Sequence, residues 1–226
     1  RRSSDLKLTA SGSLLVTDVD QNQASFQTTV TPVGSTLGRL VLGADGLYSF
    51  TVLNADAQYL GAADSKVDTF TVKSIDGTAK DVSFTTLGTN DPAIIGNPTV
   101  ADVTESFQVV AGNLQAAGTI SVSDVDQNQS GFQTGVTSAV GALGNLALAV
   151  DGSYVYSVAN SAVLYLGDTE TKVDTFTIKS IDGTTKDVSF TIHGVNQGAT
   201  IGNPSPAAVI EDFNPILGRL TETGQI

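Results

Sequence analysis

Apolar and polar residues alternate along two adjacent runs in the stretch Lys66 to Thr85, KVDTFTVKSIDGTAKDVSFT. In the first run, Phe70 and Val72 alternate with threonine and lysine, and the second run continues the alternation. A period of two places every second side chain on the same face of a strand. The Asp76-Gly77 pair between the runs favours a tight turn, because glycine accepts positive φ without a steric cost. The pattern therefore predicts a β-hairpin with one apolar face.

A second hairpin is predicted earlier in the chain. Its strands are 40–42 and 48–52, joined by the turn sequence GADG, and Tyr48, Phe50 and Val52 would share one face. We also expect a short strand at 14–16 and a short helical turn near 59–61, but no helix longer than two turns.

The pattern repeats along the chain. Residues 66–85 recur as 172–191 with changes at only two positions, and the same offset of 106 residues relates Asp18 to Asp124 and Gly46 to Gly152. A fixed long period indicates an array of similar structural units. Many short strands separated by turn signals are typical of an all-β sandwich, so the sequence predicts tandem β-sandwich repeats.

The period divides the chain. We expect a β-sandwich in residues 1–92 that lacks its opening strand, a complete β-sandwich in residues 93–198, and the opening segment of a third repeat in residues 199–226. Two interpretations of the tail stay open. It is part of a third repeat in a longer array, or it is donated to the first repeat of another molecule, since a sandwich without one strand exposes backbone donors at an open edge.

Composition narrows the classes of partner and chemistry. The 226 residues carry a net charge of −12, which disfavours nucleic acid and anionic membrane surfaces and favours cations. There is no cysteine, so stability has to come from the core and from bound ions rather than from disulfides. No apolar run is long enough to insert into a membrane. We expect the chain to be a piece of a longer exported protein.

Two loops carry oxygen ligands at alternate positions, a pattern that suits Ca²⁺ because this ion takes six to eight hard oxygen ligands. The other interpretation is that these side chains only cap turns through hydrogen bonds to the backbone. The two loops contain Asp18, Asp20 and Asn22, and Asp124, Asp126 and Asn128.

The order of these motifs resembles the VCBS repeat, a cadherin-like, immunoglobulin-like module. A strand at 12–16, D-x-D at 18–20, the D-G-x-Y-x-F stretch at 45–50, S-x-D-G-T at 74–78 and G-T-N-D-P at 88–92 follow the family pattern, and the second repeat follows it at the same offset. The family forms tandem arrays in large bacterial surface proteins, including biofilm adhesins exported by type I secretion. The resemblance covers nearly the whole chain.

The resemblance implies a calcium site between repeats. In cadherin-like modules, D-x-D and N-D residues gather around ions at domain junctions, so Asn90, Asp91 and Glu105 are expected to join Asp124 and Asp126. The sequence departs from the family pattern at the second boundary, where 196–198 read Asn-Gln-Gly and a carboxylate is lost. Calcium would bind there more weakly or not at all.

Enzymatic chemistry is not expected. With no cysteine and with His193 as the single histidine, nucleophilic triads and nitrogen or sulfur metal centres are nearly excluded. The acidic residues lie in turns that both repeats contain, which does not suit an active site. The repeated tyrosines fit core packing better than stacking on sugars, and a Lys–Asn isopeptide crosslink stays a minor alternative.

The sequence thus favours a structural and adhesive module of a bacterial extracellular protein, a spacer or filament segment stiffened by calcium. Its expected partners are neighbouring repeats or copies of itself, including by head-to-tail strand exchange. The alternative is a carbohydrate-binding module that recognises exopolysaccharide.

Overall fold

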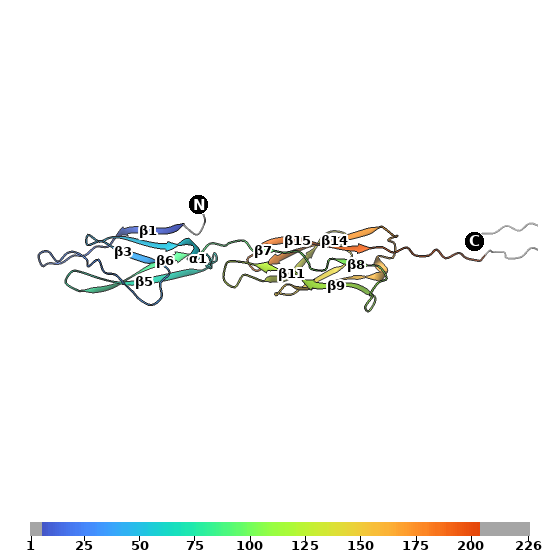
Figure 1. Ribbon diagram of the computed structural model, residues 1–226, viewed down its shortest axis with the longest axis horizontal. Coiled ribbons are helices and arrows are strands. Elements are labelled where there is room, and N and C mark those ends of the chain that lie inside the picture. The colour runs from blue at the N-terminus through green and yellow to red at the C-terminus, as the bar shows by residue number, and fades with distance from the viewer. Residues whose placement is uncertain (1–5, 204–226) are drawn as a thin grey trace, which may run out of the picture.

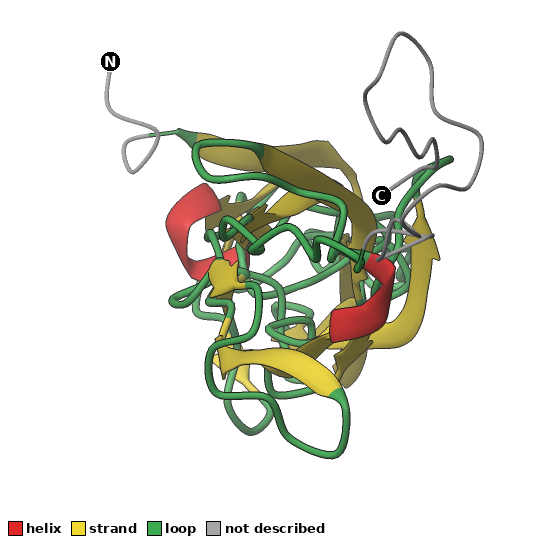
Figure 2. Ribbon diagram, turned by 90° about the vertical axis from the view of Figure 1, so that its right-hand side faces the viewer, coloured by secondary structure: helices red, strands yellow, loops and turns green. Residues whose placement is uncertain are grey.

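The chain forms two β-sandwich units that lie end to end in a computed structural model, which describes residues 6–203 (Figure 1). Each unit has its own hydrophobic core, one centred on Phe50 and Phe70 and the other on Tyr156 and Phe176. Figure 2 looks along the long axis and shows that strands and loops make up nearly all of the described chain. The predicted all-β sandwich architecture is confirmed.

The first unit contains two sheets of three strands each. In one sheet the strand order is β1-β4-β3, and in the other it is β2-β5-β6. Their bounds are β1 Lys7–Ser13, β2 Thr31–Pro32, β3 Arg39–Leu42, β4 Leu47–Leu53, β5 Ser65–Lys73 and β6 Ala79–Leu87.

The second unit repeats this arrangement and adds strands to it. Its main sheets have the orders β12-β13-β9 and β11-β14-β15-β8, and β7 pairs with β10 in a small ladder of two strands. The bounds are β7 Ile94–Ile95, β8 Asp102–Thr104, β9 Asn113–Thr119, β10 Val122–Ser123, β11 Phe132–Ser138, β12 Asn145–Leu148, β13 Ser153–Ala159, β14 Thr171–Ser180 and β15 Thr185–His193. Strands β7, β8 and β10 have no counterpart among the described strands of the first unit.

Both predicted hairpins are confirmed. In the hairpin of β5 and β6, Phe70 pairs with Val82 across the ladder, and Phe70 and Val72 are buried, whereas Lys73 is exposed. Gly77 adopts a φ of 98° in the turn, as the sequence predicted. In the second unit Phe176 occupies the same position and is completely buried.

Two local expectations were wrong in detail. The strand expected at 14–16 is absent, because β1 ends at Ser13 and residues 14–18 lie outside any strand. The helical turn lies earlier than 59–61, as α1 at Asn54–Ala57, and the second unit has a 3₁₀ turn, η2, at Asn160–Ala162. Within residues 6–203, no helix is long and apolar enough to cross a membrane.

A buried aspartate fixes a loop over the core of the second unit. Asp174 accepts hydrogen bonds from the backbone N–H groups of Leu143 and Gly144 and, at 2.8 Å, from the Tyr156 hydroxyl. Burial acts to raise the pKa of Asp174, but these bonds and that from Lys172 outweigh it and hold the pKa below its usual range. The first unit uses Asp68 in the same way on its own loop.

Candidate functional site

The D-x-D-x-N loop has the same local structure in both units. The Asp126 N–H donates to Asp124 Oδ1 at 2.9 Å, and Asn128 adopts a φ of 62°, a left-handed conformation that asparagine tolerates. The first unit shows the same bond, from the Asp20 N–H to Asp18 Oδ1, also at 2.9 Å. The expected turn chemistry is therefore present in both loops, and it is not what distinguishes them.

The loop of the second unit lies against the end of the first. The Gln127 N–H donates to the Tyr59 carbonyl oxygen at 2.9 Å, and Gln127 Nε2 donates to Asp64 Oδ2 at 3.1 Å. Asp126 Oδ2 accepts the backbone N–H of Asp91 at 3.0 Å. Because β6 leads directly into residues 88–92, these contacts hold the linker and the two units together.

Two carboxylate oxygens at this junction are buried without a partner. Asp126 is only 2% exposed, and neither its Oδ1 nor Asp124 Oδ2 has a hydrogen bond. A buried carboxylate oxygen without compensation is costly. The ion pairs of the described chain lie elsewhere, at Lys66–Asp68, Lys172–Asp174 and His193–Asp102. The junction therefore has a local excess of negative charge and unused oxygen lone pairs.

The expected metal ligands are only partly brought together. Among residues 6–203, no three acidic, histidine or cysteine side chains form a group that could hold a metal ion. Asn90 donates through Nδ2 to the Asp91 carbonyl oxygen and, at 3.4 Å, to Asp182 Oδ2. An ion at Asp124 and Asp126 would thus need further ligands from carbonyl or amide oxygens or from water, all of which Ca²⁺ accepts.

Glu105 does not lie with Asp124 and Asp126, which corrects the expectation from the sequence. It accepts a hydrogen bond from the Val195 N–H at 3.1 Å and from Gln197 Nε2 at 2.8 Å. The physical reason is topological. Strand β8 runs parallel to β15 and carries Glu105 to the end of the second unit that is opposite the junction.

Asp182 is a junction residue that sequence reasoning missed, because its Asp-Gly pair was interpreted only as a turn. Its Oδ2 accepts the Ala93 N–H at 3.2 Å and so anchors the first residue after the linker. Burial acts to raise the pKa of Asp182, but hydrogen bonds from Ser180, Thr184 and Ala93 lower it by more. Only the fold could reveal that this turn meets the linker.

His193 has a structural contact. Its Nε2 lies 3.1 Å from Asp102 Oδ1, which places the pair across the parallel ladder of β8 and β15. Of the repeated tyrosines, Tyr154 is buried in the core, and Tyr48 and Tyr59 are half-buried against the core of the first unit, as the packing interpretation expects. Tyr165 departs from it, because 64% of its surface is exposed.

The chain matches no model of a known protein family, and no curated protein is similar enough to count as a match. Among solved structures it is similar to a protocadherin gamma B4 extracellular domain (14% identity, TM-score 0.43, 86% of this chain and 31% of that one) and to protocadherin gamma B3 domains EC1-4 (12%, 0.42, 85% and 46%). Drosophila N-cadherin EC1-4 is also similar, with 10% identity and a TM-score of 0.34 over 85% of this chain and 46% of that one. The chain spans less than half the length of these proteins.

Proposed function

We propose that the chain is a structural and adhesive module of a bacterial extracellular surface protein, a spacer that takes part in cell adhesion or biofilm. The observation that carries this proposal is the junction, where buried Asp126 of one unit binds the linker at Asp91 and the two units lie end to end. A spacer needs such a joint, because relative motion of domains is otherwise the default. No enzymatic activity is part of the proposal.

Calcium stiffens this joint in the proposed mechanism. Asp124 and Asp126 would hold the ion through the two oxygens that lack partners, and Asn90 and Asp91 lie on the linker beside them. The bound ion supplies positive charge that offsets the buried carboxylates. The set Asp18, Asp20 and Asn22 stands at the other end of the first unit, where it would serve a preceding repeat.

The first prediction is that calcium raises the melting temperature. An ion that binds only the folded state stabilises it by RT ln(1 + [L]/Kd), which is about 2.7 kcal/mol at a hundredfold excess over Kd. Thermal unfolding is to be compared in Ca²⁺ and in chelator for the chain, for Asp126→Asn and for the control Asp20→Asn, whose side chain is exposed.

The chain and the Asp20→Asn control should gain stability from calcium, and Asp126→Asn should lose that gain. An unchanged melting temperature in the unaltered chain would refute the calcium site, and an equal loss in both variants would place the ion elsewhere.

The proposed partners are neighbouring repeats or other copies of the chain, joined head to tail. Carbohydrate binding is the weaker rival, because stacking on a sugar needs an exposed ring. Among the repeated tyrosines Tyr154 is buried, and only Tyr165 is mostly exposed, at 64%. Reproducible binding to one class of polysaccharide on a glycan array would favour the rival.

A further inference from the structure

Residues 93–106 add two strands, β7 and β8, to the second unit. Strand β7 pairs with β10, and β8 extends the other sheet through its parallel ladder with β15. Along this segment Ile95 packs against the core and Val103 belongs to it, with 7% of its surface exposed. The second unit therefore has no open edge at β15.

Polar contacts fix the path of this segment. The Ala93 N–H donates to Asp182 at 3.2 Å, and Lys186 Nζ donates to the carbonyl oxygen of Ile95 at 2.8 Å. The Val100 N–H donates to the Tyr154 hydroxyl at 2.9 Å. Each partner is thus a residue outside the segment.

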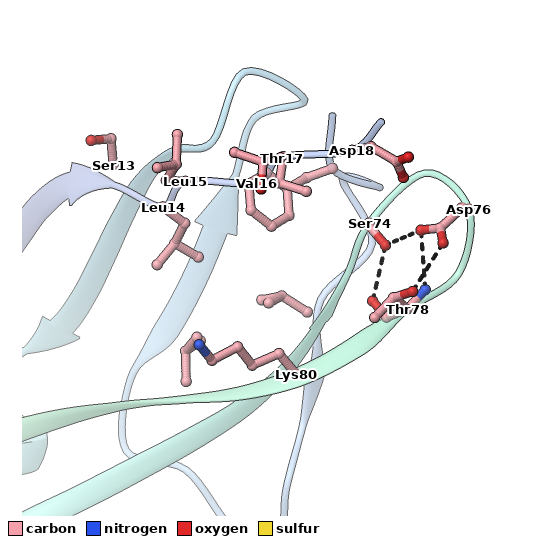
Figure 3. Close-up of a pocket in the computed structure, with 13 residues that line it drawn as sticks. Ser13, Leu14, Leu15, Val16, Thr17, Asp18, Ser74, Asp76, Thr78 and Lys80 are labelled. Carbon is pink, nitrogen blue, oxygen red and sulfur yellow. Dashed lines mark hydrogen bonds between the residues drawn. The ribbon is translucent and has the colours of Figure 1, made fainter. Parts of the chain in front are cut away.

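The first unit has the same partners, and none of residues 6–203 covers them. A cavity of about 360 Å³ is lined by Leu14, Val82, Asp76 and Lys80, the counterparts of residues that contact 93–95 in the second unit or lie beneath them (Figure 3). A second cavity, of about 280 Å³, lies between β1 and β6, where the second unit holds Val103. We call the two cavities together the open groove.

The open groove leaves apolar side chains exposed that their counterparts bury. Leu8 on β1 is 41% exposed, whereas its counterpart Leu114 is 1% exposed. Phe84 is only half-buried, whereas Phe190 is completely buried. Covering the groove would remove this apolar surface from water, which favours binding of a matching segment.

We propose that residues 199–212 of a second copy fill the open groove of the first unit, an inference that rests on the proposed head-to-tail partnership and names its contacts. This segment, ATIGNPSPAAVIED, is identical to residues 93–106 at eight of fourteen positions. Ile201 stands where Ile95 does and enters the larger cavity. Val209 stands where Val103 does and enters the smaller one.

The polar contacts carry over with the same register. Lys80 donates to the carbonyl oxygen of Ile201, and Asp76 accepts the N–H of Ala199, as Lys186 and Asp182 do for the intact segment. One bond is lost, because Pro206 replaces Val100 and has no N–H to donate.

The start of the donated segment is free to bind. Residues 199–203 are all exposed and lie in no strand, and Ile201 has 82% of its surface in contact with water. A single exposed isoleucine is not unusual. Its match to the half-buried Ile95 is what assigns it a place in the groove.

The exchange has to occur between molecules. Residue 199 would bind at Asp76, in the turn at the end of the first unit that faces away from the junction. The segment that follows β15 leaves the second unit at the opposite end of the molecule (Figure 1). Adjacent residues lie 3.8 Å apart at the Cα atoms, so one chain cannot span both ends.

The contact between copies would repeat the junction within the chain. Gln21 takes the place of Gln127, and Tyr165 and Glu170 take the places of Tyr59 and Asp64. Docking would cover Tyr165. Because the contact joins two different surfaces in a straight succession, it does not close, and it generates a filament.

Sedimentation of the full chain tests the proposal. The unaltered chain should form polymers that grow with concentration, and Val209→Asp should remain a monomer because it places a charge in an apolar cavity. The matched control is Ala208→Asp, which reproduces the exposed Asp102 of the second unit and should polymerise like the unaltered chain. Both positions follow residue 203, so neither change alters a residue of strands β1 to β15.

The proposal would be overturned if the unaltered chain is monomeric at its highest soluble concentration, or if polymers persist in Val209→Asp. A synthetic peptide of residues 199–212 provides a second measurement. It should bind the Val209→Asp chain one to one, while the peptide carrying the same aspartate should not, and absence of peptide binding also overturns it. Neither result bears on the calcium effect on melting, because that comparison is made with Val209→Asp added to all three proteins, which keeps them monomeric.

Discussion

At the scale of single residues, the alternation in β14 determines which side chains carry stability. We predict that Phe176→Ala lowers the free energy of unfolding by about 3–5 kcal/mol, since it leaves a cavity in a fully packed core. Thr177→Ala should cost less than about 1 kcal/mol, because it removes only an exposed cross-strand bond to Asp187. Denaturant unfolding of both variants measures the difference. Equal losses of unfolding free energy would mean that the wrong side chains of β14 have been assigned to the core.

The second prediction concerns the hydrogen bond from Tyr156 to buried Asp174. The first unit has Phe50 at the counterpart position, so the core shape accommodates a ring without a hydroxyl. Tyr156→Phe should therefore cost only what the bond to a charged group contributes, about 1.5–3 kcal/mol. Denaturant unfolding checks it, and a cost as large as that of Phe176→Ala would show that packing rather than the bond is disturbed.

At the scale of elements, the β14–β15 turn links acid stability to the junction. The pKa of Asp182 is lower in the folded chain than the value near 3.9 of an unfolded aspartate, so its stabilising effect is complete above about pH 4 and is lost as the pH falls further. We predict that Asp182→Asn reduces the dependence of melting temperature on pH between about 2 and 5. The exposed Asp56→Asn serves as control, and an unchanged slope in Asp182→Asn would contradict the assignment.

The sequence predicted the hairpins because residues that are neighbours in the chain determine them. Alternation in Phe70 and Val72 and a glycine at 77 determine strand, face and turn without knowledge of any distant residue. The strand expected at 14–16 failed for a related reason. Its counterpart β10 exists because β7 pairs with it, and pairing of segments far apart in the chain is not visible in local alternation.

At the scale of the whole molecule, the period of 106 residues indicated where similar contacts recur, but not which residues meet at the junction. The D-x-D-x-N loops were identified as candidate ligands from their spacing alone. The misplacement of Glu105 and the role of Asp182 both depend on the direction of β8 and β15, which no residue pattern encodes. The boundaries at 92 and 198 stay predictions.

The proposed effect of calcium is to turn the joint between the two units into a stiff one. Because the chain has no cysteine, spin labels can be placed at Lys73→Cys and Lys179→Cys, one exposed site on each unit, in the Val209→Asp chain. The distribution of distances between the two labels is then measured by pulsed electron paramagnetic resonance in Ca²⁺ and in chelator. We predict a narrow distribution with calcium, a broader one in chelator, and no calcium-dependent narrowing when Asp126→Asn is added. Distributions of the same width in calcium and in chelator would contradict the claim.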